Sequence, residues 1–226
     1  MLRRALIENY CDHRMKPQLL GADNMQGKSF GFIIHMSALE IFATLISVVG
    51  VALTIRRSLY CWPINLVAYI IYGYLFFEYQ LYGETILQGC FVALGCYGWW
   101  CWIKDRRQVG TDNATAEISV LQIQGLRLVL HVVLTLIIGA LSGWVLATLT
   151  DAALPYLDAE LACLSLLATY WTSQHYLQTW SLWIVVDIVY VLMFGYKELY
   201  LTAVLYAGFV GLAIFGLQSW RKQQRA

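Results

Sequence analysis

The residues best suited to bind a ligand lie between positions 180 and 194, in a stretch that is otherwise almost entirely apolar. Trp180, Trp183, Asp187, Tyr190 and Phe194 recur at steps of three and four, so on a helix they share one face. A carboxylate in hydrocarbon costs about 2.5–3.5 kcal/mol on insertion scales, so Asp187 should face the protein interior or a water-filled cavity. Aromatic rings beside an acid favour a flat, cationic ligand. The alternative is that Asp187 bonds a neighbouring helix and the aromatic rings only pack.

The composition is that of an integral membrane protein. The chain has 226 residues, of which 60% are hydrophobic and 13% charged, with a mean hydropathy of +0.61. Its cations gather at the ends of apolar runs, which argues against a nucleic-acid-binding surface. The six cysteines form no CxxC pair, and no His, Cys and acid cluster has metal-ligand spacing, so we expect neither a metal nor a cofactor.

Seven apolar segments each approach the ~20 residues that cross a bilayer. They lie at about 36–55, 61–80, 85–103, 126–149, 155–175, 179–196 and 199–219. Residues 1–35 hold no spanning run, so this segment is either an extramembrane tail or lies upstream of a true start at Met36. The fold class predicted is therefore an all-α integral membrane protein.

Positive charges set the expected orientation. Arg56 and Arg57 follow the first span, Arg106 and Arg107 the third, and Arg221 the seventh, so all three clusters share one side of the membrane. By the positive-inside rule that side is the cytoplasm, which places the C-terminus inside and the N-terminus in the periplasm.

The chain repeats itself at an offset of 118 residues. Trp62 aligns with Trp180, Tyr72 with Tyr190, and Gly98 with Gly216, and other matched aromatic residues extend the alignment. Two three-helix repeats in the same orientation need one inverting helix between them, which predicts a 3+1+3 arrangement. The predicted parts are the first repeat at 36–103, a cytoplasmic loop at 104–125, the inverting helix at 126–150, the second repeat at 151–220, and a tail at 221–226. Such parallel repeats are typical of transporters with a midplane site.

The two repeats differ at positions that a ligand site would use. At the same offset Asn65 aligns with Trp183, Tyr69 with Asp187, and Gln88 with Tyr206. A nearly symmetric frame could thus enclose an asymmetric ligand. The candidate binding residues, which combine polar and aromatic side chains of both repeats, are Trp180, Trp183, Asp187, Tyr190, Gln88, Asn65, Tyr69, Tyr72 and Tyr206. For Gln88 and Asn65, a hydrogen bond between helices is as plausible as ligand contact.

Several motifs resemble the PnuC family of bacterial vitamin transporters. They are the W-x-x-W-x-x-x-D of Trp180 to Asp187, the L-Y-G-E-T-I-L-Q of 81–88, the Y-G-W-W-x-W ending at Trp102, and the K-E-L-Y-L-T-A-V-L-Y of 197–206. The resemblance covers about residues 36–220 and implies a fold similar to the SWEET sugar transporters, commonly as a homotrimer, in the bacterial inner membrane. It also implies that Trp180, Trp183 and Asp187 clamp the ligand and that Gln88 is a polar contact.

The resemblance implies nicotinamide riboside as the substrate, taken up by facilitated diffusion and trapped when a cytoplasmic kinase phosphorylates it. Many nicotinamide riboside carriers of the family have Asn where this chain has Asp187. Thiamine, which also carries a fixed positive charge on an aromatic ring, is therefore an alternative substrate, whereas neutral riboflavin suits an acid less well.

Three classes of function compete at this stage. The first is a uniporter for a cationic vitamin, which we favour. The second is a proton- or sodium-coupled carrier, but no second intramembrane carboxylate is placed to pair with Asp187. The third is an enzyme or structural subunit, and no nucleophile and base pair, metal cluster or phosphate loop favours an enzyme.

Overall fold

Seven helices make up the part of the chain described by the computed structural model, which covers residues 22–112, 119–150, 154–196, 198 and 200–225. These segments form helices because the core of a bilayer contains no water, so the backbone N–H and C=O groups must hydrogen-bond within the segment itself. Pro155 stands at the first position of its helix, where a missing N–H costs nothing. The bounds are α2 Ala22–Ile55, α3 Cys61–Glu78, α4 Tyr82–Asp112, α5 Gly125–Leu149, α6 Pro155–Ser173, α7 Gln178–Tyr196 and α8 Tyr200–Gln224.

Each predicted span corresponds to one helix, but several ends differ. Helix α2 begins at Ala22 rather than near residue 36, and α4 continues to Asp112 beyond the predicted end at 103. The run from Lys104 to Arg107 is solvated and rich in good helix formers, so charge alone does not end this helix. Helix α6 ends at Ser173, two residues early. Residues 1–21 of the predicted tail at 1–35, residues 113–118 of the predicted loop at 104–125, and residues 151–153 of the predicted second repeat lie outside the described residues.

Five of the described helices, α2, α4, α5, α7 and α8, are long and apolar enough to cross a membrane. Helices α3 and α6 are not among these five, and α6 carries Asp158 and Glu160 in its first two turns. Helix α6 also has an unusually large buried face, including Ala168, which is fully buried. A helix shielded by protein needs less apolar surface than one that faces lipid.

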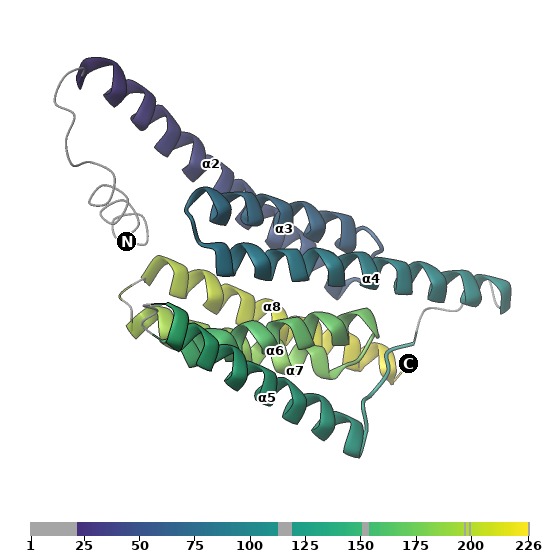
Figure 1. The fold of residues 1–226 in the computed structure, drawn as a ribbon. Coiled ribbons are helices and arrows are strands. Elements are labelled where there is room, and N and C mark those ends of the chain that lie inside the picture. Colours follow the sequence, from purple (N-terminus) through teal and green to yellow (C-terminus); the bar gives the residue numbers. More distant parts are fainter. Residues whose placement is uncertain (1–21, 113–118, 151–153, 197, 199, 226) are drawn as a thin grey trace.

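The helices form two groups, which Figure 1 shows one above the other. Helices α2, α3 and α4 pack in sequence in the first group, and α6, α7 and α8 pack in sequence in the second. The groups meet where α4 contacts α6 and where α2 contacts α8. Helix α5 packs along α6, and its many exposed leucine, valine and isoleucine side chains give it an apolar outer face.

Tryptophans that align at the 118-residue offset have the same geometry in both groups. Trp62 lies edge-on to Trp102, with ring centroids 5.4 Å apart and an interplanar angle of 88°. Trp180 lies edge-on to Trp220 at 5.4 Å and 85°. The first ring of each pair covers a glycine, Gly98 or Gly216. Tyr72 and Tyr190 likewise stack on Phe76 and Phe194, at 5.9 and 5.8 Å.

The backbone repeats as well. Arg57 and His175, which align at the same offset, adopt left-handed φ angles of 53° and 56° just beyond α2 and α6. Gln80 and Glu198 form a second aligned pair, with φ angles of 61° and 59°. Four non-glycine residues in this sparsely populated region, paired by one offset, indicate two copies of one helix-turn pattern.

Two reciprocal hydrogen bonds join the groups at one end of the bundle. The indole Nε1 of Trp102 on α4 donates to the carbonyl oxygen of Thr172 on α6 at 3.2 Å. The indole Nε1 of Trp220 on α8 donates to the carbonyl oxygen of Ile55 on α2 at 3.1 Å. These carbonyls lie at helix ends, where they lack an intrahelical donor, so each tryptophan satisfies the first helix of the other group.

His175 lies in the loop between α6 and α7 at this same end, outside the helices. His175 is 2% exposed, and its ring stacks on Trp102 with ring centroids 4.5 Å apart. Its Nε2 lies 3.2 Å from Oδ2 of Asp105, but the two groups are not aligned as a hydrogen bond. Burial lowers the pKa of His175 to about 4, and the cations Arg57 and Arg106 add to this effect, although Asp105 opposes it. His175 is therefore neutral in the folded protein at neutral pH.

The depressed pKa of His175 predicts a loss of stability on acidification. A histidine in the unfolded chain binds its proton near pH 6.5. The contribution of neutral His175 to the free energy of unfolding is therefore complete above that pH and is lost as the pH falls towards 4. Between pH 7 and 4.5 the wild type should lose about 2 kcal/mol more than His175→Asn, which tolerates the left-handed backbone. Thermal unfolding of both proteins across this range checks the prediction; parallel pH profiles would contradict it.

Candidate functional site

Asp187 lies on α7 and is only 5% exposed. Within the described part of the chain, its carboxylate has no hydrogen-bond or salt-bridge partner. The hydroxyls of Tyr190 and Tyr206 are close enough to interact with it electrostatically. A buried charge is costly unless a partner compensates it, so an unpaired acid in this position is a strong candidate for a contact with a bound cation.

An aromatic cluster from α7 and α8 lies beside Asp187. Tyr190 and Tyr206 have ring centroids 4.6 Å apart, Phe194 stacks on Tyr206 at 5.3 Å, and Phe209 meets Tyr206 edge-on at 6.0 Å. Tyr190 and Tyr206 remain half-buried rather than enclosed. An acid next to partly accessible tyrosine rings combines a charge contact with surfaces on which a flat ring can stack.

Two predicted residues approach this cluster from the first group of helices. Tyr72 on α3 is close enough to Tyr206 to interact electrostatically, and its hydroxyl shares a 2.9 Å hydrogen bond with Thr44 on α2. Gln88 on α4 has a buried side-chain oxygen without a hydrogen-bond partner among the described residues. An unsatisfied buried amide is costly, so Gln88 is also a candidate for a ligand contact.

Asn65 and Tyr69 have packing contacts inside the first group instead. The Asn65 side chain fills the notch that Gly50 leaves on α2. The Tyr69 ring stacks on Phe91 of α4 at 5.1 Å with an interplanar angle of 23°. The structure therefore joins these two residues to the α2, α3 and α4 interfaces and does not group them with Asp187.

The two tryptophans of the predicted clamp differ in their surroundings. Trp180 is 3% exposed and packs in the core against Gly216 and Trp220, with no hydrogen-bond partner for its indole nitrogen among the described residues. Trp183 is half-buried and contacts both the core cluster around Trp180 and the cluster that includes Val186 and Tyr190. Only Trp183 is placed one helical turn from Asp187 with part of its surface accessible.

Glu84 and Ser165 are site neighbours that the sequence interpretation left out. Glu84 on α4 interacts electrostatically with Tyr190 and Tyr206, and the side chain of Ser165 on α6 is hydrogen-bonded to Tyr190. Glu84 precedes Gln88 by four residues, so their common helical face was the available signal. Nothing in the sequence around Ser165 indicated its contact, which depends on how α6 packs against α7.

The comparisons with known proteins bear on this arrangement of helices. The family described as nicotinamide mononucleotide transporter matches residues 37–222. The chain belongs to this family. It is a transporter rather than an enzyme, and a multi-pass protein of the bacterial inner membrane that carries a small molecule.

Individual members of the nicotinamide mononucleotide transporter family show how far the likeness extends. The nicotinamide riboside transporter PnuC of Escherichia coli K12 is 24% identical over an alignment of 212 residues, and the match covers 84% of this chain and 87% of PnuC. The riboflavin/roseoflavin transporter RibM of Streptomyces davaonensis is 21% identical over an alignment of 197 residues, and the match covers 84% of this chain and 88% of RibM. A crystal structure of the vitamin B3 transporter PnuC matches with a TM-score of 0.65 at 23% identity, over 89% of this chain and 88% of that one.

The fold of that crystal structure therefore agrees with the helical architecture described above. The relatives differ in the molecules that their names give, a nicotinamide riboside in one case and a riboflavin in the other. Membership of the family consequently leaves the substrate of this chain to be inferred from its own site residues.

Proposed function

We propose that this protein imports nicotinamide riboside across the inner membrane by facilitated diffusion, and that phosphorylation in the cytoplasm traps the arriving vitamin for NAD synthesis. The observation that carries the proposal is Asp187, a buried acid without a partner in the described residues, beside the rings of Tyr190 and Tyr206. Nicotinamide riboside has a pyridinium ring, so it would supply both the missing positive charge and a flat surface for stacking.

Thiamine is the second candidate, because its thiazolium ring also bears a fixed positive charge. Riboflavin is a weaker candidate despite the name of one relative, because a neutral ring would leave Asp187 uncompensated. In this proposal Trp183, Asp187, Tyr190, Tyr206, Tyr72 and Gln88 contact the vitamin. Trp180, Asn65 and Tyr69 support those residues from the core.

The proposal includes a membrane arrangement. All seven described helices would span the bilayer as two parallel repeats around α5, in the 3+1+3 order of the SWEET transporters, with the N-terminus periplasmic and the C-terminus cytoplasmic. The matched tryptophan pairs at the 118-residue offset support this order, because equivalent packing in both groups is what parallel repeats require. We expect a homotrimer, as the family resemblance implies.

Exchange in proteoliposomes tests facilitated diffusion. Vesicles that contain the purified protein and unlabelled nicotinamide riboside should take up labelled vitamin with no ion gradient and with no kinase present. Exchange should end when labelled and unlabelled vitamin have the same ratio, and the same total concentration, on both sides of the membrane. Accumulation beyond that point, abolished by a protonophore, would instead indicate a proton-coupled carrier in which Asp187 takes the proton.

A further inference from the structure

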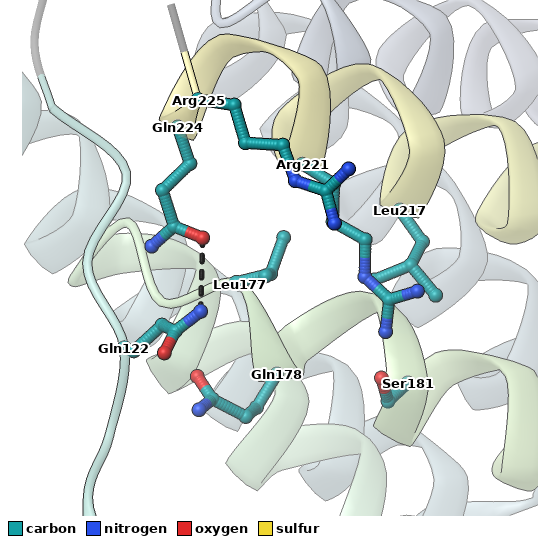
Figure 2. Close-up of a pocket in the computed structure, with 8 residues that line it drawn as sticks. All are labelled: Gln122, Leu177, Gln178, Ser181, Leu217, Arg221, Gln224 and Arg225. Atoms are coloured by element: carbon teal, nitrogen blue, oxygen red, sulfur yellow. Dashed lines mark hydrogen bonds between the residues drawn. The ribbon is translucent and has the colours of Figure 1, made fainter.

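A polar cleft of about 290 Å³ lies at the end of the bundle that carries the cationic clusters, away from Asp187. It is formed by the segment before α5, the start of α7 and the end of α8. Figure 2 shows two arginine side chains and the Ser181 hydroxyl on one side of this view and three glutamines on the other. The lining residues are Gln122, Leu177, Gln178, Ser181, Leu217, Arg221, Gln224 and Arg225.

Side-chain hydrogen bonds hold the walls of this cleft in place. Gln178 binds the backbone of Ile123 twice, accepting from its N–H at 3.1 Å and donating to its carbonyl at 3.0 Å. Gln122 donates to the side-chain oxygen of Gln224 at 2.9 Å, as the dashed line in Figure 2 marks. The segment before α5 is thereby fastened to both α7 and α8, so the cleft is a built feature rather than a gap between helices.

The cleft concentrates positive charge and hydrogen-bond donors. Arg221 lies in the last turn of α8 and Arg225 is the first residue beyond it, and both side chains line the cleft. Neither Asp nor Glu is among the eight lining residues, and Ser181 contributes a hydroxyl on the same side of the view in Figure 2 as the arginines. The first turn of α7 also lines this cleft, and the positive end of a helix dipole favours an anion.

We propose that this cleft binds a phosphate-bearing anion. Guanidinium groups present paired N–H donors that match the oxygens of a phosphate, and two of them in one cleft can hold a phosphate or a diphosphate. The volume is at the lower end of small-molecule sites, which run from about 300 to 1,000 Å³, so it suits the charged group with a small organic portion. This site is independent of the vitamin-binding site proposed above, because the two sites share no side chains.

Lys222 provides a matched control, since it stands between Arg221 and Arg225 in the sequence but does not line the cleft. Purified full-length protein in neutral detergent should bind inorganic pyrophosphate saturably by calorimetry and unfold at a higher temperature in its presence. Arg221→Gln with Arg225→Gln should weaken this binding at least tenfold, while Lys222→Gln should change it less than twofold. The proposal would be overturned if the double arginine variant and the Lys222 variant lost pyrophosphate affinity equally. It would also be overturned if the wild type bound neither pyrophosphate nor an anionic lipid.

The phosphate could come from a soluble molecule or from a lipid headgroup, and the membrane distinguishes these sources. In nanodiscs of phosphatidylcholine, saturable pyrophosphate binding that needs both arginines supports a soluble anion. The alternative result is that pyrophosphate does not bind in these nanodiscs, whereas added phosphatidylglycerol raises the unfolding temperature of the wild type and of the Lys222 variant but not of the double variant. In that case the ligand is an anionic lipid. Stabilisation by phosphatidylglycerol that is the same in the double variant, without pyrophosphate binding, contradicts the site.

Discussion

Replacing Asp187 with asparagine is expected to weaken binding of nicotinamide riboside about ten- to a hundredfold. The substitution keeps the shape of the side chain and its ability to form hydrogen bonds but deletes its charge. Loss of a charge-assisted contact in a poorly hydrated site should cost about 1.5–3 kcal/mol, which corresponds to that range of affinities. Titration of the purified variant, followed by tryptophan fluorescence, measures the change.

Glu78→Gln is the matched control, because it removes one carboxylate from an exposed position at the end of α3. This control should bind as the wild type does. If Asp187→Asn remains folded and also binds as tightly as the wild type, the charge of Asp187 has no part in recognition. Asp187 would then be a residue that bonds a neighbouring helix.

Gly98→Ala and Gly216→Ala are expected to destabilise the protein more than alanine at any other glycine of α4 or α8. A Cβ at Gly216 would stand 2.5–2.6 Å from three ring atoms of Trp180, and a Cβ at Gly98 would overlap the ring of Trp62. Both rings are nearly fully buried and held edge-on against a second tryptophan, so they cannot move aside easily. Overpacking of this kind costs about 1–3 kcal/mol, and occasionally more.

Gly89 and Gly211 supply controls on the same two helices, since a Cβ at either would meet nothing within 4 Å. Alanine is about 0.8–1.0 kcal/mol more favourable than glycine within a helix, so Gly89→Ala and Gly211→Ala should be neutral or stabilising. Thermal unfolding of the four variants should therefore separate them into two pairs of opposite sign. Similar behaviour of all four would show that close packing of tryptophan on glycine does not hold the helices of each group together.

Periodicity and length were sufficient to predict the helices, because a membrane segment must bond its own backbone and so leaves a continuous apolar run. The 118-residue offset also predicted which residues adopt equivalent geometry, as the pairs around Gly98 and Gly216 show. The early start of α2 and the extension of α4 were not predictable from hydropathy. Helix α4 continues beyond its apolar run because Lys104, Arg106 and Arg107 are good helix formers despite their charge.

The candidate site was predictable only in part. Trp180 and Asp187 share a helical face, but seven residues separate them by about 10 Å along the axis. Periodicity therefore grouped a core tryptophan with a residue two turns away. The contacts of Asn65 with Gly50 and of Tyr69 with Phe91 depend on which helices become neighbours, and that information is not contained in any single segment.

The most direct test of the proposed function is a binding titration of the purified protein with nicotinamide riboside, thiamine and riboflavin under one set of conditions. An unpaired acid beside tyrosine rings predicts saturable binding of the cationic vitamins nicotinamide riboside and thiamine, and binding of riboflavin at least tenfold weaker than that of nicotinamide riboside. Riboflavin binding as tight as that of nicotinamide riboside, or no binding of either cationic vitamin, would contradict the assignment of this site to a cationic ring.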